Sequence, residues 1–294
     1  MTLFHSQLTS ARWLPRTVFY PWLRPLYRLV EALQGWRSGE RVILSGGGEA
    51  WIYRPKVPPT EPAPGVLWIH GGGLVMGHAT QDGGTCQALA DEIGAVVVSA
   101  NYRLVPEHSF PTPLEDCFRA LEALSTLPEV DASRLAVGGQ SAGGGLAAAV
   151  ALLARQRGVA LRFQALIYPM LDDRSSDRVH ANADGFRGWS ADSNRYGWAS
   201  YLADVDPSDI PDAAVPGRVR DLTGLPPAWV GVGTLDLFHD EDVAYARRLR
   251  EAGVPCELLV VEGAHHGFDV THAKTEVAKA FRRSWVDALR AGLA

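Results

Sequence analysis

One serine stands in a pattern that can make it a nucleophile. Residues 139–143 read Gly-Gln-Ser-Ala-Gly, which fits G-x-S-x-G, between an apolar run and a long segment rich in alanine and leucine. This order predicts a strand, a sharp turn and a helix, with the Ser141 hydroxyl exposed at the turn. Gly139 and Gly143 have no Cβ, so the strand and the helix can pass close together. The helix N-terminus and the Ala142 N–H would favour a developing oxyanion. The pattern is short, and it also fits a tightly packed turn without chemistry.

A run of glycines could complete the polar surroundings of such a serine. His70 is followed by Gly71, Gly72 and Gly73, directly after an apolar stretch. Three consecutive glycines let the backbone curl so that successive N–H groups face one point, as an oxyanion hole requires. The run alone could be an ordinary flexible turn. Beside a G-x-S-x-G sequence, however, it indicates an oxyanion hole.

A carboxylate and a histidine follow two later apolar runs. Asp236 lies nearest the end of the run at 228–232, whereas Asp240 and Glu241 suit the N-terminus of a helix. After the last predicted strand come two adjacent histidines, either of which could take a proton from the serine while a carboxylate holds its other nitrogen.

The chemistry of the residues does not separate His265 from His266. Their position after the acid nevertheless gives the order Ser, Asp, His along the chain, the order expected where all three lie at the carboxyl ends of strands in an α/β sheet. Each of these residues alone would more often be structural.

The elements that must position these residues alternate along the chain. We expect strands at residues 41–45, 50–53, 65–70, 95–99, 134–138, 163–168, 228–232 and 257–261. We expect helices at residues 85–93, 113–127, 146–157, 240–252 and 271–291. Alternation of this kind predicts an α/β fold: a mostly parallel central sheet with helices on both faces.

Two segments interrupt or precede this pattern. Between residues 170 and 225 the alternation dissolves, with only a short helical stretch at 192–202, which favours a lid inserted before the strand that carries the acid. Residues 1–38 combine aromatic side chains and arginines with three prolines. They fit either a helical part of the cap, which we favour, or an amphipathic segment that contacts a membrane surface. We therefore divide the chain into an N-terminal helical part of the cap (1–38), a core (39–169), a lid insertion (170–225) and a second part of the core (226–294).

Composition excludes several classes of protein. The chain has 294 residues, 47% of them hydrophobic, and a formal net charge of −5, which argues against a nucleic-acid-binding protein. Its three cysteines match no zinc-site spacing and are too few for a disulfide scaffold, which indicates a reducing compartment. No window is apolar enough for a membrane span, and no signal-peptide pattern opens the chain. We expect a cytoplasmic protein, and nothing in the sequence separates a monomer from a homodimer.

Taken together, these motifs closely resemble the hormone-sensitive lipase-like family of α/β-hydrolase esterases. The resemblance extends over roughly residues 40–290 and is carried by the segments 70–73, 101–107, 139–143, 233–241 and 266–268, with weaker support from 198–202 and 221–227. It implies an α/β-hydrolase fold whose lid is built from an N-terminal helical region and an insertion. One departure is Gln140, because many relatives carry an acidic residue just before the nucleophile. A second, minor one is Val105, where alanine is common.

The resemblance also implies roles for individual residues. Ser141 would be the nucleophile, Asp236 the orienting acid and His266, which precedes Gly-Phe, the general base. The N–H groups of Gly72, Gly73 and Ala142 would form the oxyanion hole, with His70, Gly71, Gly139 and Gly143 supporting the motifs.

The activity implied is that of a serine carboxylesterase that needs no metal and no organic cofactor. Aromatic residues of the lid (Trp189, Tyr196, Trp198 and Tyr201) would enclose an apolar pocket for short to medium acyl esters. The same site could instead hydrolyse amides or lactones. A non-catalytic small-molecule receptor is the alternative of another class, and the presence of all three triad residues counts against it.

Overall fold

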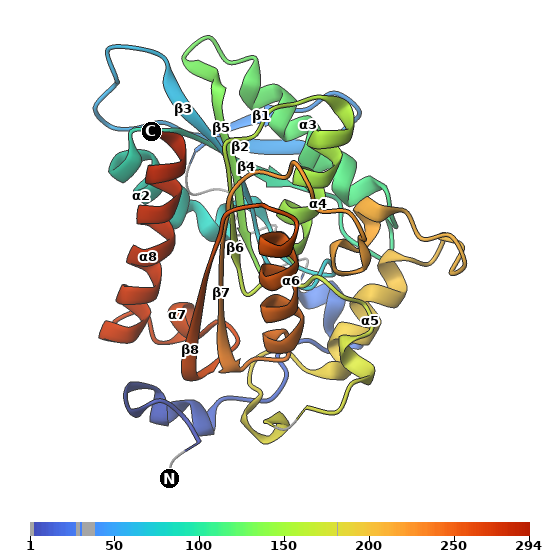
Figure 1. Ribbon diagram of the computed structural model, residues 1–294. Helices are drawn as coiled ribbons and strands as arrows, with labels where there is room; N and C mark the ends of the chain where they lie inside the picture. Colours follow the sequence, from blue (N-terminus) through green and yellow to red (C-terminus); the bar gives the residue numbers. More distant parts are fainter. Residues whose placement is uncertain (1–2, 28–29, 31–38, 181) are drawn as a thin grey trace.

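A twisted sheet forms the centre of the molecule (Figure 1). The computed structural model describes residues 3–27, 30, 39–180 and 182–294. The strands are β1 (Glu40–Ile43), β2 (Glu49–Tyr53), β3 (Ala63–Ile69), β4 (Val96–Asn101), β5 (Val130–Gln140), β6 (Phe163–Ile167), β7 (Ala228–Leu235) and β8 (Cys256–His265). Their order across the sheet is β1-β2-β4-β3-β5-β6-β7-β8. β1 pairs with β2, and β2 with β4, in antiparallel fashion, whereas the remaining neighbours are parallel.

Helices cover both faces of this sheet. The α-helices are α2 (Gly83–Ile93), α3 (Thr112–Ser125), α4 (Ala142–Arg157), α5 (Ala191–Tyr201), α6 (His239–Glu251), α7 (Phe268–Thr271) and α8 (Glu276–Leu293). Short 3-10 helices are η1 (Ser6–Trp13), η2 (Pro21–Leu23), η3 (Ala79–Asp82), η4 (Ser175–Asp177), η5 (Ala183–Gly185), η6 (Asp212–Ala214) and η7 (Pro216–Arg218). Figure 1 shows α2 and α8 on one face and α3, α4 and α6 on the other. This is the α/β architecture that the alternating pattern predicted.

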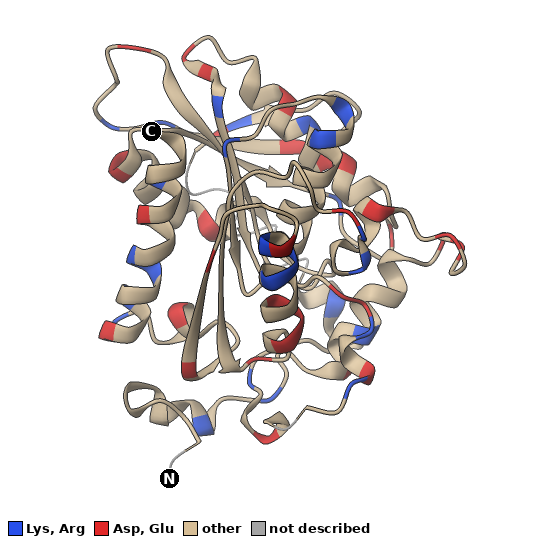
Figure 2. Cartoon of the chain, viewed as in Figure 1, with Lys and Arg blue, Asp and Glu red and all other residues tan. Residues whose placement is uncertain are grey.

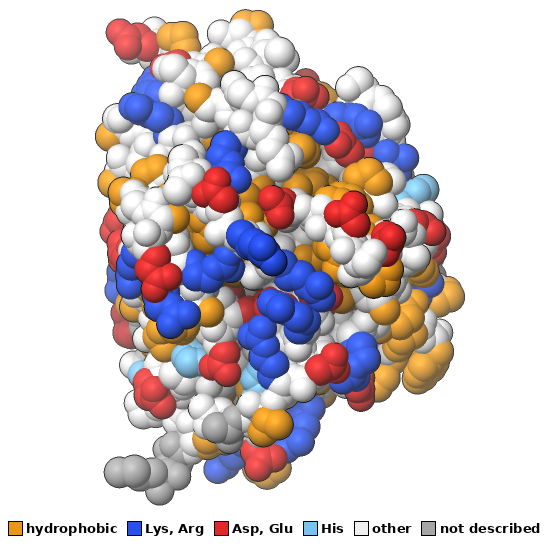
Figure 3. All heavy atoms as spheres, turned by 45° about the vertical axis from the view of Figure 1, so that its right-hand side comes forward, with side chains coloured by type: hydrophobic (Ala, Val, Ile, Leu, Met, Phe, Trp, Pro, Cys, Tyr) orange, Lys and Arg blue, Asp and Glu red, His pale blue; other side chains and the backbone are white. Residues whose placement is uncertain are grey.

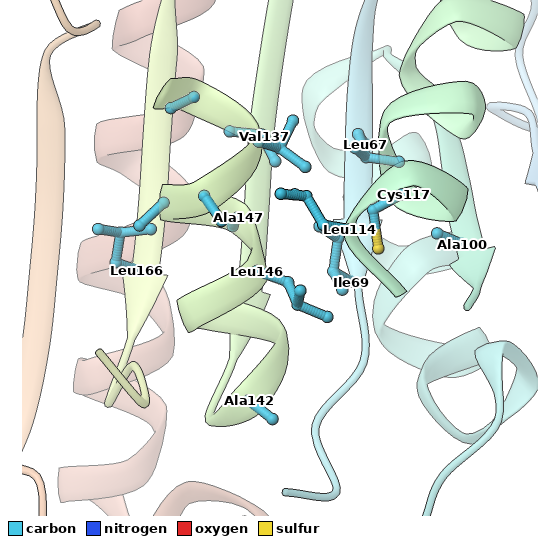
Figure 4. Close-up of a cluster of buried hydrophobic side chains, with 14 of the residues drawn as sticks. Leu67, Ile69, Ala100, Leu114, Cys117, Val137, Ala142, Leu146, Ala147 and Leu166 are labelled. Carbon is cyan, nitrogen blue, oxygen red and sulfur yellow. The ribbon is translucent and has the colours of Figure 1, made fainter. Parts of the chain in front are cut away.

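Apolar packing on both faces holds the strands in place. Figure 4 shows Leu67, Ile69 and Val137 of the sheet facing Leu114 of α3 and Leu146 of α4. All five side chains are at most 3% exposed. Burial of such side chains from water is the main stabilising contribution to a core of this kind. Charged residues occur mainly in the helices and in the loops (Figure 2), and side chains of both signs occur across the face seen in Figure 3.

The parallel register brings the carboxyl ends of the central strands to one edge of the sheet. Ile69 of β3 is opposite Gly139 of β5, and Gln140 is opposite Ile167 of β6. On the other side, Leu235 of β7 is opposite His265 of β8. The residues that follow these strands therefore meet at the same edge, where ligands of open α/β sheets bind.

One predicted element is wrong in its extent. Instead of one closing helix at 271–291, the structure has the short helix α7 and then α8, which begins only at Glu276. The Thr275 side chain accepts a hydrogen bond from the Ala278 N–H and caps α8. A threonine before an acidic first turn is a helix-start signal, and the prediction overlooked it.

The N-terminal segment lies across the edge of the sheet that carries the predicted site. The His5 N–H donates to the Gly263 carbonyl at 2.9 Å. Further along, the Val18 N–H donates to the Gly188 carbonyl and the Gly188 N–H donates to the Pro15 carbonyl, both at 3.0 Å. The segment thus contacts both the end of β8, just before the histidines, and the 170–225 insertion. Residues 31–38 of the predicted N-terminal cap lie outside the described residues.

Candidate active site

The serine lies at the turn between β5 and α4. Ser141 has φ +58° and ψ −124°, a backbone conformation that non-glycine residues rarely adopt, and its side chain is nearly buried at 7% exposure. A Cβ on Gly139 would lie 2.5 Å from the Gly143 carbonyl oxygen, and one on Gly143 would lie 2.1 Å from that of Ile69. The two glycines are therefore required by the close approach of strand, helix and neighbouring strand, as the sequence pattern predicted.

Three predicted side chains form a hydrogen-bonded line. His266 Nε2 is 2.9 Å from Ser141 Oγ, and His266 Nδ1 is 2.7 Å from Asp236 Oδ2. Asp236 is 1% exposed, and its other oxygen accepts a hydrogen bond from the Phe238 N–H at 3.0 Å. An ionised carboxylate only accepts hydrogen bonds, so Nδ1 carries the imidazole proton and Nε2 is left to accept from the serine hydroxyl. The geometry allows His266 to take the proton of Ser141.

The neighbouring histidine faces elsewhere. His265 is the last residue of β8, and its Nδ1 is 2.9 Å from the His266 carbonyl oxygen. Its ring lies edge-on to that of His272, with centroids 5.5 Å apart. Burial lowers the pKa of His265 to about 4, so this side chain stays neutral at physiological pH. The structure brings His266, and not His265, to the serine.

The acids that follow Asp236 have other partners. Glu241 accepts hydrogen bonds from the Leu171 and Asp172 N–H groups and from the Ser175 hydroxyl, and thereby joins α6 to the start of the 170–225 insertion. Asp240 contacts the neighbouring His239 at 2.8 Å and is more than half exposed. The sequence placed both residues at a helix N-terminus, and both lie in the first turn of α6.

Asp242, in the same turn, is buried without compensation. It is 0% exposed, and neither carboxyl oxygen has a hydrogen-bond partner among the described residues. Burial, together with the neighbouring Glu241 and Asp236, raises the pKa of Asp242 well above its ordinary value. The folded protein therefore holds this proton to a higher pH than the unfolded chain, which loses it above about pH 4. Because the folded state binds more protons, this group lowers stability as the pH rises toward its folded pKa.

We predict that Asp242→Asn removes this pH dependence. The difference in free energy of unfolding between the variant and the wild type should grow in favour of the variant as the pH rises from about 4 toward the raised pKa of Asp242. Urea unfolding at pH 5, 6, 7 and 8 measures the difference. Asp240→Asn, on the exposed side of the same helix turn, serves as the matched control and should show a constant offset. Parallel pH curves for the wild type and Asp242→Asn would contradict the prediction.

The glycine run has the backbone geometry of a tight loop. Gly72 and Gly73 have φ of +129° and +61°. A Cβ on Gly72 would lie 1.9 Å from the Met76 carbonyl oxygen, and one on Gly73 would lie 1.9 Å from Cη2 of Trp189. Among the backbone hydrogen bonds of the described residues, none has the N–H of Gly72, Gly73 or Ala142 as donor. Gly72 and Gly73 line the same pocket as Ser141, and Ala142 follows Ser141 directly in the chain.

His70 supports this loop and does not face the serine. Its side chain is fully buried, and its Nδ1 is 2.8 Å from the Gly71 carbonyl oxygen. The ring stacks on Tyr102 with centroids 4.3 Å apart. Burial lowers the pKa of His70 to about 4, so the imidazole is neutral. The position of His70 agrees with a structural role, in which its side chain stabilises the loop of glycines 71–73.

A pocket of about 580 Å³ opens onto the serine. Ser141, His266, Gly72 and Gly73 line it together with Trp189 of the insertion. Its wall also includes exposed apolar side chains of the N-terminal segment and of α7, among them Val18, Leu26, Val30 and Val270. No sequence signal pointed to this rim, because its members come from separate parts of the chain.

Only one of the four lid aromatics predicted to enclose the pocket lines it. Trp189 does so, whereas Trp198 and Tyr201 are buried around a separate cavity of about 10 Å³ behind Ala142. Tyr196 packs against Phe19, with ring centroids 5.6 Å apart. The prediction was wrong for these three residues because their spacing in the sequence does not show which aromatic side chains of the insertion point toward the serine.

Comparisons with known proteins agree with this architecture. Residues 66–270 match the model of a family described as having the alpha/beta hydrolase fold. The chain is 35% identical to the esterase LipI of Mycobacterium tuberculosis over 264 residues, covering 87% of this chain and 78% of the relative. It is also 35% identical to an ethyl acetate hydrolase of Pseudomonas putida, covering 74% of this chain and 70% of that protein.

A solved structure agrees as well. The structure of a bacterial heroin esterase superimposes with a TM-score of 0.89 at 35% identity, covering 99% of this chain and 98% of that one. The resemblance to hormone-sensitive lipase-like esterases is thereby confirmed, and the chain belongs to the α/β-hydrolase fold family.

Proposed function

We propose that this protein is a serine carboxylesterase with Ser141 as nucleophile, His266 as general base and Asp236 as orienting acid. The observation that carries the proposal is the hydrogen-bonded line from Asp236 through His266 to Ser141 at the base of the pocket. Relatives that are named esterase and ethyl acetate hydrolase support the reaction class.

The geometry supports the following reaction. Ser141 Oγ attacks the ester carbonyl while His266 Nε2 takes its proton, and Asp236 stabilises the resulting imidazolium. The N–H groups of Gly72, Gly73 and Ala142 donate to the tetrahedral oxyanion; loss of one such donor costs about 3–4 kcal/mol. His266 then protonates the leaving alcohol. Water repeats the attack on the acyl-enzyme, and the acid is released.

The pocket favours short to medium acyl chains. Trp189 closes one side directly over Gly73, and the volume of about 580 Å³ must hold both the acyl and the alcohol parts of an ester. We predict that kcat/KM for p-nitrophenyl esters from acetate to palmitate peaks between acetate and octanoate. It should fall by about tenfold or more at palmitate, since each misplaced methylene is worth about 1–3 kcal/mol. A maximum at palmitate, or activity that rises sharply above the micellar concentration of a triglyceride, would refute this preference.

Amide or lactone hydrolysis at the same site is the alternative within enzymes. It would gain support if the protein cleaved p-nitroanilides or lactones while leaving the ester series untouched. A receptor that binds esters without turnover is the alternative of another class, and an inert wild type that still binds an ester would favour it. The hydrogen-bond contact between Ser141 and His266 indicates that the serine is activated. It therefore favours turnover over binding without reaction.

The N-terminal segment offers a surface for peripheral membrane contact. Trp13 is 78% exposed and Trp22 is 75% exposed, and residues 1–38 contain five arginines and one acidic residue. Tryptophan favours the membrane interface, and arginine favours anionic lipid. Within the described residues, no helix combines the length and the apolar character needed to cross a bilayer. The cytoplasmic location stays a prediction, and the choice between monomer and homodimer stays open.

We predict that the full chain co-sediments with vesicles of phosphatidylserine and phosphatidylcholine more than with phosphatidylcholine alone. The double variant Trp13→Ala and Trp22→Ala should lose this binding. Val57→Ala, at an 83% exposed side chain in a distant proline-rich loop, is the matched control and should retain it. The membrane contact would be contradicted if the wild type, the double variant and Val57→Ala sedimented equally with the vesicles. It would also be contradicted if none of the three sedimented with them.

A further inference from the structure

Four polar side chains beside the pocket are not used by the reaction described above. Gln140 Nε2 lies 2.9 Å from Asp82 Oδ1, and Gln140 Oε1 lies 3.0 Å from the Tyr168 hydroxyl. The same hydroxyl lies 2.9 Å from Asp269 Oδ1. A chain of hydrogen bonds thus runs from η3, past the residue before the nucleophile and the end of β6, to α7.

The two carboxyl groups of this hydrogen-bonded chain differ in exposure, because Asp82 is buried whereas Asp269 is only partly buried. Asp82 is 8% exposed, and burial raises its pKa to about 6. Burial also raises the pKa of Asp269. The indole N–H of Trp68, which can only donate, contacts Asp82 Oδ2 at 2.9 Å and so requires that oxygen to accept. One end of the chain therefore has a fixed hydrogen-bond direction.

The number of protons follows from the donors and acceptors. With Asp82 ionised, Gln140 turns its NH₂ toward that carboxylate and its carbonyl toward Tyr168. The single Tyr168 proton then goes to Gln140 Oε1, and the contact between Tyr168 and Asp269 forms only if Asp269 supplies a proton of its own. In this arrangement, the hydrogen-bonded chain holds one proton on its two carboxyl groups.

The reverse arrangement satisfies the same contacts. A protonated Asp82 can donate to Gln140 when the amide is turned by 180°. The Gln140 NH₂ then donates to the Tyr168 oxygen, and Tyr168 donates to an ionised Asp269. The two arrangements contain the same atoms and protons, and they differ in which end of the chain carries the negative charge.

The end at Asp269 lies beside the catalytic histidine. Asp269 follows His266 by three residues, and the Tyr168 ring packs edge-on against the His266 ring with centroids 4.8 Å apart. A negative charge on Asp269 favours the protonated imidazole. Other ionisable groups around the chain and the histidine are Asp236, His265, His272 and Cys86.

We propose that Asp82, Gln140, Tyr168 and Asp269 form a positioning relay that shares one proton and sets the charge beside His266 through the orientation of the Gln140 amide. This inference rests on the proposed esterase function. The relay also gives a physical reason for an amide at position 140. A carboxylate there would face the Asp82 carboxylate, and the two hydrogen-bond acceptors would repel each other unless one of them bound a further proton.

Two isosteric variants test the relay from its two ends. In Asp82→Asn, the carbonyl of the new amide must accept from Trp68, so its NH₂ turns Gln140 and leaves Asp269 ionised. In Asp269→Asn, the new NH₂ donates to Tyr168 and leaves Asp82 ionised, with no charge beside His266. We expect the midpoint of the acidic limb of the kcat/KM profile for p-nitrophenyl butyrate to lie higher in Asp82→Asn than in Asp269→Asn by about 0.5 to 1 pH unit.

Breaking the relay in its middle should remove this response. In a Tyr168→Phe background, Asp82→Asn should no longer move the midpoint, whereas in a Tyr245→Phe background it should. Tyr245 is the matched control because it is buried and its hydroxyl has no partner among the described residues. If Asp82→Asn does not fold by circular dichroism, Gln140→Met replaces it. Gln140→Met removes the hydrogen bond to Asp82. It should therefore shift the midpoint by the same amount as Tyr168→Phe does.

The outcomes separate the relay from the function on which it rests. Identical midpoints in an active wild type, Asp82→Asn and Asp269→Asn would overturn the relay while leaving the esterase assignment intact. A shift that persists in the Tyr168→Phe background would also overturn it. A wild type without hydrolytic activity would overturn the proposed function, and the relay with it.

Discussion

Ser141→Ala is expected to abolish ester hydrolysis, with kcat reduced by about four to six orders of magnitude. The substitution removes the hydroxyl oxygen that lies 2.9 Å from His266 Nε2 at the base of the pocket. What remains is the oxyanion hole and substrate binding, which by themselves still accelerate the reaction about 10³- to 10⁴-fold over the reaction in water. Turnover of p-nitrophenyl butyrate, followed with the wild type at the same enzyme concentration, measures the loss.

A second serine controls for the loss of a buried hydroxyl. Ser99 is 0% exposed and donates to the Ala79 carbonyl, and it has no contact with the histidine. Ser99→Ala should keep kcat within about threefold of the wild type, at a stability cost of about 1 kcal/mol for one hydrogen bond. Full activity in Ser141→Ala would remove the basis of the assigned mechanism.

Asp236→Asn is expected to lower kcat by about ten-thousand-fold while the fold is retained. Asp236 Oδ1 accepts the Phe238 N–H, and Oδ2 accepts from His266 Nδ1. In the variant, the amide oxygen keeps the bond to the Phe238 N–H, so the NH₂ group faces the imidazole. Nδ1 must then accept, and the proton moves to Nε2, where it points at Ser141 and blocks proton transfer.

Steady-state kinetics separate this tautomer effect from a loss of binding. KM should stay within about threefold of the wild type, because Asp236 does not line the pocket. Asp240→Asn replaces an exposed carboxylate four residues later in the chain and should leave kcat unchanged. An Asp236→Asn variant with nearly normal kcat would show that the carboxylate has no part in orienting His266.

Much of the architecture follows from local patterns. The strands were predicted because each is a short apolar run bounded by glycine, proline or a polar turn. Ser141 was predicted because its turn has glycines at both positions where a Cβ would collide with backbone. The histidine was ambiguous because His265 and His266 both follow the same run. The structure separates them: His265 ends β8, and the His266 side chain turns toward Ser141.

Other features depend on contacts that no local pattern contains. Asp82, Gln140, Tyr168 and Asp269 meet only because the sheet order places β3, β5 and β6 side by side and brings the loop after β8 to the same edge. The rim of the pocket likewise joins Val18 of the N-terminal segment to Val270 of α7. Such groupings require the tertiary fold, since the residues are separated by tens to hundreds of positions in the sequence.

The contact between Gly73 and Trp189 has a consequence for protein engineering. The insertion meets the glycine loop so closely that a Cβ on Gly73 would lie 1.9 Å from the indole ring. A chimera that takes residues 170–225 from a relative would therefore exchange one side of a matched pair. A smaller side chain at position 189 would leave the loop without its support, and a larger one would displace it. Recombination libraries of this scaffold should inherit positions 73 and 189 from the same parent.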